Sequence, residues 1–315
     1  MKSVSRVAPI ALLGVLLACQ RSVADETPPD ATPTTQAPAA ADTRIVIQNV
    51  DLHLPEGVLR ISHLEGRILP TREESLPDLR EDGSWRIELS TAQVAMDHAT
   101  VGQVLSAGEG APFREAQVLG DGAGGLEVSG VFRGPLPLSF SLSGPLTVED
   151  GALDLAPVRV RVLGVPAAGP LPLETLFDPD GARGVRLAGN HLRIDPTASI
   201  PSLLIDARVE GVRLRPDGLI LDLIGEAPAA DLPVPDDIRS SNFIAFQGGT
   251  LRAGSTRLEE VDLVLMDLDP STPFALHAGR LQEQLVAGWT KLRPDGGQRV
   301  YLPDLGPLAQ AASLD

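Results

Sequence analysis

The amino-acid sequence predicts a mainly β (α+β) protein, built as a long, curved antiparallel sheet or meander with a few short helices. Apolar and polar residues alternate over short segments, most plainly at Leu138–Ser143 and Val158–Val162, as expected of half-buried strands. Glycine and proline clusters separate most of these segments. Arg215-Pro216-Asp217-Gly218 has the composition of a tight turn between two such strands.

The first 42 residues predict export and anchoring. A short basic region, Met1–Arg6, precedes an apolar run, Val7–Ala18, which has the length of a signal-peptide core and is too short to span a membrane. The run ends at Cys19, the only cysteine, and resembles the bacterial lipoprotein signal, in which this cysteine is acylated. We expect residues 1–18 to be the signal peptide and residues 19–42, rich in Pro, Thr and Ala, to be a disordered tether. The alternative is an ordinary secretory leader in which the cysteine is coincidental.

Composition limits the partners. Hydrophobic residues make up 43% of the chain but aromatic residues only 3%, so the interior must be aliphatic. The formal net charge of −16 argues against nucleic acid, because phosphate neutralisation needs a clustered basic surface. It also disfavours electrostatic docking on anionic lipid headgroups.

The folded part opens with two strands whose apolar positions change phase. In residues 44–54 the change falls at Gln48-Asn49, and in residues 85–96 it falls at Ser90-Thr91. An extra residue in a β-bulge produces such a slip and bends the strand, so both slips favour a strongly curved sheet. The charged, proline-bearing segment Leu69–Gly83 between these strands is predicted to be a loop.

Residues Asp97–Leu105 predict the first helix, because Asp97 can cap it and Val101, Val104 and Leu105 share one face. Six short strands are expected after it, at residues 117–119, 126–132, 136–143, 146–148, 153–155 and 158–163.

The C-terminal part begins with a proline-rich stretch, Ala227–Asp237. Apolar residues at helical spacing then predict a helix within Leu276–Trp289 that packs back onto the sheet. An alternative role for this helix is a gate over a lipid groove. We therefore divide the folded part into a curved β-meander, residues 43–226, and C-terminal strands with a covering helix on the same sheet, residues 227–315.

No catalytic, cofactor or metal site is expected. Cys19 is the only cysteine, so thiol chemistry is excluded from the folded part. The five histidines, at positions 53, 63, 98, 191 and 277, lack metal-ligand spacing. The chain has no G-x-S-x-G motif and no P-loop, and Gly120–Gly125 is better explained as a hairpin turn. The aspartates near Asp267 lack the EF-hand pattern. The sequence therefore predicts a protein that is not an enzyme.

A resemblance covers much of the folded part. The segments GVRLAGNHLRIDP (184–196), ARVEGVRLRPDGLILDL (207–223) and FIAFQGGTLRAG (243–254), with MDLDPSTPF and EQLVAGWTKLRPDGGQRVYLPDL after them, resemble an uncharacterised family of bacterial envelope lipoproteins. That family is similar to the mycobacterial-type phospholipid-binding (mannan-elongation) proteins and to the tubular lipid-binding (TULIP) superfamily. The resemblance implies a TULIP-like half-barrel with lipid against its inner face. Gln20, where lipoproteins retained in the inner membrane usually have aspartate, implies a periplasmic, outer-membrane anchor.

We therefore predict a membrane-tethered, non-catalytic protein that binds phospholipid or another acyl-chain lipid in an aliphatic groove and acts in lipid transfer or envelope maintenance. The alternatives are an envelope scaffold with a closed core and no small ligand and, with little support from the residues, an enzyme acting on lipid or glycan. Ten aliphatic or aromatic residues at alternating positions are candidates to line the groove: Leu138, Phe140, Leu142, Val158, Val160, Val162, Val209, Leu219, Leu221 and Leu223.

Overall fold

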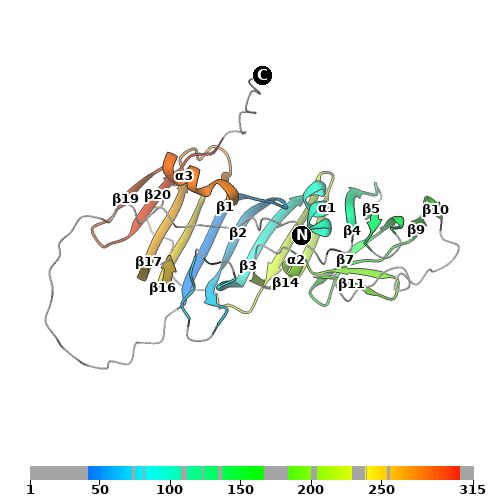
Figure 1. Cartoon of the computed structure of the whole chain (residues 1–315), viewed down its shortest axis with the longest axis horizontal. Helices are drawn as coiled ribbons and strands as arrows, with labels where there is room; N and C mark the ends of the chain where they lie inside the picture. The colour runs from blue at the N-terminus through cyan, green and yellow to red at the C-terminus, as the bar shows by residue number, and fades with distance from the viewer. Residues whose placement is uncertain are drawn as a thin grey trace, which may run out of the picture.

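The computed structural model describes residues 42–305, apart from 73–74, 80, 82, 108–110, 112, 123, 134–136, 167–183, 200–203, 229–237, 239 and 254–255. Within these residues the chain forms three sheets, which are mostly antiparallel, and a few short helices (Figure 1). The predicted fold class is confirmed, and the large sheet is not closed into a barrel. The predicted signal peptide, the tether and most of the proline-rich stretch 227–237 lie outside the described residues.

The largest sheet has eleven strands and extends along most of the elongated molecule (Figure 1). Its main path runs β14-β15-β3-β2-β1-β16-β17-β20-β19, with β13 beside β3 and β18 beside β1. Three of its pairings are parallel: β1 with β18, β3 with β13, and β17 with β20. The strands are β1 (Thr43–Leu54), β2 (Gly57–Pro70), β3 (Trp85–Asp97), β13 (Ile205–Asp206), β14 (Arg208–Arg215), β15 (Gly218–Ile224), β16 (Phe243–Ala253), β17 (Thr256–Asp267), β18 (Phe274–His277), β19 (Trp289–Leu292) and β20 (Gln298–Leu302).

Two smaller sheets lie at the other end of the molecule (Figure 1). The five-stranded sheet has the order β10-β9-β6-β5-β4, and the four-stranded sheet has the order β11-β12-β8-β7. Their strands are β4 (Phe113–Gly120), β5 (Leu126–Phe132), β6 (Ser139–Gly144), β7 (Leu146–Glu149), β8 (Ala152–Leu155), β9 (Arg159–Val162), β10 (Val165–Pro166), β11 (Val185–Ala188) and β12 (His191–Ile194). All six short strands expected in this part of the chain are present, with boundaries shifted by a few residues.

Helix α1 (His98–Ser106) confirms the first predicted helix. The Asp97 side chain accepts a hydrogen bond from the Thr100 amide, as an N-cap does, and Val101, Val104 and Leu105 are buried. This buried face covers the junction between the long sheet and the five-stranded sheet.

The predicted C-terminal helix is shorter than expected. The 3₁₀ turn η4 (Ala278–Arg280) and helix α3 (Leu281–Ala287) occupy only the middle of the predicted segment, because its two ends are taken by β18 and β19. On α3 only Leu281 and Gln284 are buried, and Gln284 ties the helix to the chain by donating to the carbonyls of Ala275 and Pro303.

One of the two predicted bulges is confirmed and the other is wrong. Between β2 and β3, Glu65 pairs with Thr91 but Gly66 pairs with Leu89, so Ser90 is the extra residue of a bulge. The register of β1 with β2 instead runs without a shift through Asn49. The phase change there arises because Asn49 adopts a left-handed conformation, with φ of 51°.

Candidate functional site: an aliphatic strip along the long sheet

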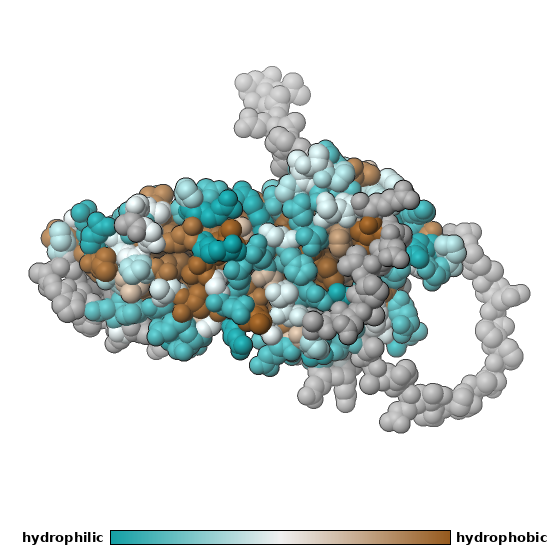
Figure 2. All heavy atoms as spheres, turned by 180° about the vertical axis from the view of Figure 1, so that it is seen from behind, coloured by the Kyte–Doolittle hydropathy of each residue, from teal (hydrophilic) through white to brown (hydrophobic). Residues whose placement is uncertain are grey.

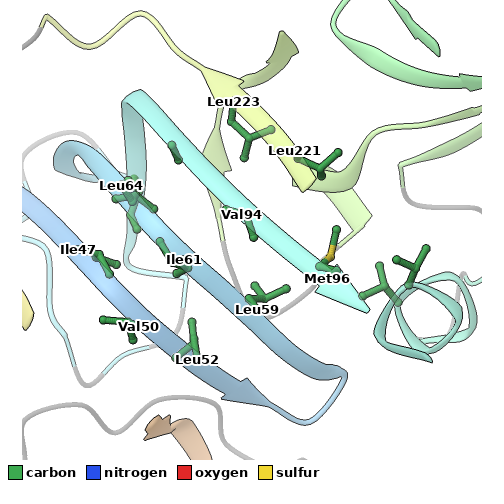
Figure 3. Close-up of a cluster of buried hydrophobic side chains, with 14 of the residues drawn as sticks. Ile47, Val50, Leu52, Leu59, Ile61, Leu64, Val94, Met96, Leu221 and Leu223 are labelled. Carbon is green, nitrogen blue, oxygen red and sulfur yellow. The ribbon is translucent and has the colours of Figure 1, made fainter. Parts of the chain in front are cut away.

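Aliphatic side chains from β1, β2, β3 and β15 cover one face of the long sheet. Figure 3 shows ten of them by name, all projecting from the same side of the four strands. Cross-strand register explains why they meet: Val94 lies opposite Ile61 on one side and opposite Leu221 on the other. We call this surface the aliphatic strip. The ten residues of the strip are buried. Seen from behind, the molecule shows hydrophobic patches along its long axis, interrupted by polar residues (Figure 2).

The strip contains a hollow near its centre, with a volume of about 60 Å³. Aliphatic side chains form its wall, and Thr197 is the one polar residue among those that line it. The lining residues are Ile47, Leu52, Leu59, Ile61, Leu64, Ile87, Leu89, Val94, Met96, Pro196, Thr197, Ile205, Leu221 and Leu223. We call it the central hollow.

A second hollow, of about 30 Å³, lies beside the first, where α1 and the smaller sheets meet the long sheet. Every residue that lines it is apolar: Met96, Val101, Val104, Leu105, Val118, Leu126, Val128, Leu146, Leu153, Leu155, Ile194, Pro196 and Leu219. We call it the distal hollow. Met96 and Pro196 line both hollows, so the aliphatic wall continues from β1 as far as β8.

The short helix α2 (Pro196–Ser199) lies at the point where the two hollows meet. Asp195 caps it, because the Asp195 carboxylate accepts hydrogen bonds from the Thr197 and Ala198 amides. The Thr197 hydroxyl also donates to Asp195, at 2.6 Å, so its hydrogen-bonding capacity is used at the helix end. The hollows therefore present hydrocarbon and little else.

Strand β13 holds the chain beside the strip after α2. The Ile87 amide donates to the Leu204 carbonyl at 2.8 Å, and Ile205 pairs in parallel with Ile87. An ion pair between Arg86 and Asp206, at 2.7 Å, fixes the same contact at the surface. Ile205, which forms part of the wall of the central hollow, is therefore held in place by backbone hydrogen bonds to β3.

Four of the ten candidate groove residues lie on the long sheet. Leu221 and Leu223 line the central hollow, and Leu219 lines the distal hollow. Val209 is buried on β14 but lines neither hollow.

The other six candidates belong to the five-stranded sheet or its approach, and none of them lines a hollow. Phe140 packs in an aromatic cluster, with its ring centroid 4.8 Å from that of Phe113. Leu142 is buried, and Leu138, Val160 and Val162 are half-buried. Val158 is 72% exposed, because it precedes β9 and lies beyond the core.

None of the lining residues on β1, β2 and β3 was among the predicted groove residues. Their alternation was visible, but periodicity does not say which of many alternating strands face one another across a hollow. A usable signal was the phase slip at Ser90-Thr91, since it marks a bend in a central strand of the strip.

Arg60, Asp51 and Asp97 alternate along their strands with residues of the strip, so their side chains lie on the opposite face of the sheet. Arg60 lies 4.0 Å from the carboxylates of Asp51 and Asp97. Burial raises the pKa of Asp51 above its usual value, and the nearby Arg60 only partly offsets this. Burial also acts to raise the pKa of Asp97, but the hydrogen bonds from Thr100 outweigh it, so that pKa is lowered.

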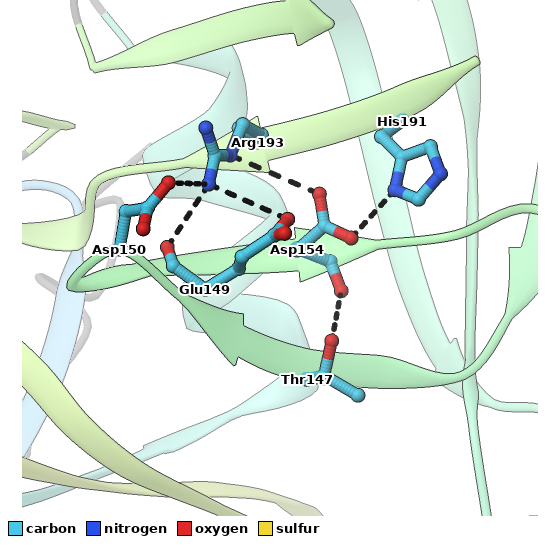
Figure 4. A network of polar contacts seen from close by, with 6 residues as sticks. All are labelled: Thr147, Glu149, Asp150, Asp154, His191 and Arg193. Carbon is cyan, nitrogen blue, oxygen red and sulfur yellow. Dashed lines mark hydrogen bonds and ion pairs between the residues drawn. The ribbon is translucent and has the colours of Figure 1, made fainter. Parts of the chain in front are cut away.

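The most concentrated polar network lies away from the strip, on the four-stranded sheet (Figure 4). Asp154 is only 3% exposed and contacts His191 Nδ1 at 2.7 Å, while Arg193 contacts Asp150 at 3.0 Å and Glu149 at 3.4 Å. Asp154 and Arg193 are direct partners in the β8–β12 register. The network therefore joins neighbouring strands, and no group of metal-ligating side chains occurs among the described residues.

Two of the five histidines, which the sequence separates by more than two hundred positions, come together. His53 and His277 are register partners in the parallel β1–β18 pair, and their rings stack with centroids 4.0 Å apart. Burial lowers the pKa of His277, with further contributions from His53 and Arg280.

Helix α3, for which the sequence suggested a gate as an alternative role, contributes no residue to either hollow. No helix among the described residues is long and apolar enough to cross a membrane. No protein-family model, curated protein or solved structure matches the chain.

Proposed function

We propose that the protein binds an acyl-chain lipid along the aliphatic strip, without catalysis. One observation carries this proposal: two adjoining hollows share Met96 and Pro196, and their combined wall is aliphatic except for Thr197. A hydrocarbon tail makes no hydrogen bonds, so a wall of this kind selects tails over polar ligands.

The hollows are small for a fully enclosed ligand. Typical enclosed pockets for drug-sized molecules have volumes of roughly 300–1,000 Å³, whereas the hollows offer about 60 and about 30 Å³. A tail therefore lies along the strip and widens it by side-chain movement. The same small volumes favour the second candidate, an envelope scaffold whose core is closed.

We also propose that the protein is tethered in the periplasm through an acylated Cys19, attached to the outer membrane. Cys19 lies outside the described residues, so this part of the proposal depends on the sequence. Metabolic labelling with a radioactive fatty acid tests it: the parent chain takes up label and Cys19→Ser does not.

Lipid extraction separates the two candidates. The chain from Gln20 to Asp315 lacks the predicted leader and the acylated cysteine but keeps every described strand and helix. It is purified, extracted for mass spectrometry and then titrated with a fluorescent fatty acid. Lipid in the extract together with saturable uptake supports the carrier, whereas a clean extract without uptake supports the scaffold.

The substitution Val94→Phe tests whether lipid binds at the central hollow. Val94 lies between Ile61 and Leu221 in the wall of the central hollow, so the larger ring occupies the space that a tail needs. We expect uptake about tenfold weaker, which corresponds to about 1.4 kcal/mol, because the added ring occupies the space of the tail. Val212→Phe is the matched control, since Val212 is half-buried on the same sheet and lines neither hollow. Equal uptake by the two variants would place any binding elsewhere.

A further inference from the structure

The β9–β10 hairpin exposes aliphatic side chains that the fold does not use. Val158 is 72% exposed, and Leu163 and Val165 are each 65% exposed, all within eight residues. The residues of β9 between them, in contrast, are packed: Val160 lies opposite Leu142 and Val162 opposite Phe140, both of which are buried. The exposed apolar side chains therefore lie at the turn (Leu163 and Val165) and at the opposite end of β9 (Val158), with packed residues between them, and Figure 1 places the hairpin at one end of the elongated molecule.

The residue at the tip is unfavourable for the turn that it forms. Val162 pairs with Val165, which leaves Leu163 and Gly164 as a two-residue turn with φ of 53° and 76°. Two positive φ values are the requirement of a type I′ turn, where Asn, Asp or Gly are favoured. A leucine in this conformation is strained, and at 65% exposure it gains little burial in return. Strain retained at an exposed position points to a role outside folding.

The charge of the hairpin is opposite to that of the protein. Residues 157–166 contain Arg159 and Arg161, both exposed, and no acidic residue, in a chain whose net charge is −16. No described residue forms an ion pair with either arginine. Their guanidinium groups are therefore available to the oxygens of a phosphate.

Strand β10 is unsuited to pairing with a strand of another protein. It has only two residues, and Pro166, which has no N–H to donate, is one of them. The exposed surface thus consists of aliphatic tips flanked by arginines. This is the composition of a segment that places its apolar side chains among acyl chains and its cations among phosphates.

We propose that the β9–β10 hairpin docks on an anionic lipid surface, with Leu163 and Val165 inserted between the acyl chains and Arg159 and Arg161 on the lipid phosphates. This contact is separate from the predicted acyl anchor at Cys19 and from tail binding in the aliphatic strip. It differs, for one local surface, from the expectation that the net charge disfavours docking on anionic headgroups.

The test measures binding of the chain from Gln20 to Asp315 to sedimented vesicles, made either of phosphatidylcholine or of equal parts phosphatidylcholine and phosphatidylglycerol. Leu163→Asn removes the apolar tip while supplying a residue that the turn favours, so it leaves the fold intact. We expect binding about tenfold weaker on both vesicles, because a leucine loses its burial among the acyl chains.

Neutralising the arginines tests the electrostatic part of the proposal, their contact with lipid phosphates. Arg159→Gln and Arg161→Gln are each expected to weaken binding to the anionic vesicles about fivefold and to leave binding to the neutral vesicles nearly unchanged. The matched controls lie on β4, at the opposite edge of the same sheet: Leu119→Asn, at a residue 57% exposed, and Arg114→Gln, at an exposed arginine. Both controls are expected to bind as the parent does.

Hairpin variants that bind anionic vesicles as tightly as the parent would overturn the proposal, and so would controls that lose binding equally. Loss of a protein partner by the hairpin variants, with vesicle binding unchanged, would assign the surface to protein recognition and also overturn it. Fatty-acid uptake is measured in parallel. Failure of vesicle docking leaves uptake by the strip intact, and Val94→Phe impairs uptake without affecting docking, so the two proposals fail separately.

Discussion

The aliphatic strip and the β9–β10 hairpin use the same residue types to opposite effect. Leu221 and Val94 face each other across paired strands and are buried, whereas Val158 and Leu163 lie beyond the edge of a sheet and are exposed. Both segments alternate apolar and polar residues, so the pattern alone does not separate them. Exposure depends on what packs against each segment. Residues of β1, β2 and α2 surround Leu221 and Val94 in the central hollow, whereas Val158 and Leu163 face solvent.

The largest expected effect comes from truncating the strip. Leu221→Ala removes a fully buried side chain and should lower the free energy of unfolding by about 2–5 kcal/mol. Val158→Ala, on the exposed hairpin, should change it by no more than about 0.5 kcal/mol. Urea unfolding of both variants checks the contrast, and similar losses would mean that the hairpin is packed.

Removing the cap of α1 should have an intermediate effect. Asp97→Ala leaves the Thr100 amide without its acceptor and should cost about 1 kcal/mol at neutral pH. The pKa of Asp97 is lowered in the folded state, so its stabilising contribution is present above its unfolded pKa of about 3.9 and is lost as the pH falls below that value. The unfolding free energies of parent and variant should therefore converge in acid. A constant difference from neutral pH into acid would contradict this assignment.

The stacked pair of His53 and His277 lies next to the central hollow, because His53 directly follows Leu52 in its lining. The pair provides a pH-dependent test of stability beside the strip. The folded-state pKa of His277 lies below its unfolded value of about 6.5. The unfolded chain therefore binds more protons in this range, and stability should fall as the pH drops through about 6.5 toward the folded pKa. His277→Gln should flatten this part of the stability profile. His63→Gln is the control, and an equal change in that variant would remove the stack as the cause.

The smallest effect is expected at the tip of the hairpin, with the opposite sign. Leu163→Asn relieves an unfavourable positive φ and should raise the free energy of unfolding by about 0.5 kcal/mol. Thermal unfolding of the variant beside Leu119→Asn measures it. A loss of stability would show that Leu163 contributes to the fold, and that would weaken the case for an external role.

Local features of the fold were predictable from the sequence. The cap at Asp97, the turn at Arg215–Gly218 and the bulge at Ser90 each depend on a few adjacent residues, and all three are present. The expected bulge at Gln48-Asn49 was wrong because a left-handed residue and an extra residue produce the same change of phase. The site was predicted only in part, since three of ten candidates line a hollow.

The sequence by itself determined the class of structure, the aliphatic character of the interior and the positions of most strands, because alternation, turn residues and caps act over a few neighbouring positions. Only the tertiary structure decided which strands meet. It brought β1, β2 and β3 together with β15 in one sheet and placed Pro196 beside both hollows, and it left Leu163 and Val165 of the β9–β10 hairpin exposed. Those outcomes depend on long-range register and on what packs opposite each face, and the period of a single strand carries no information about either.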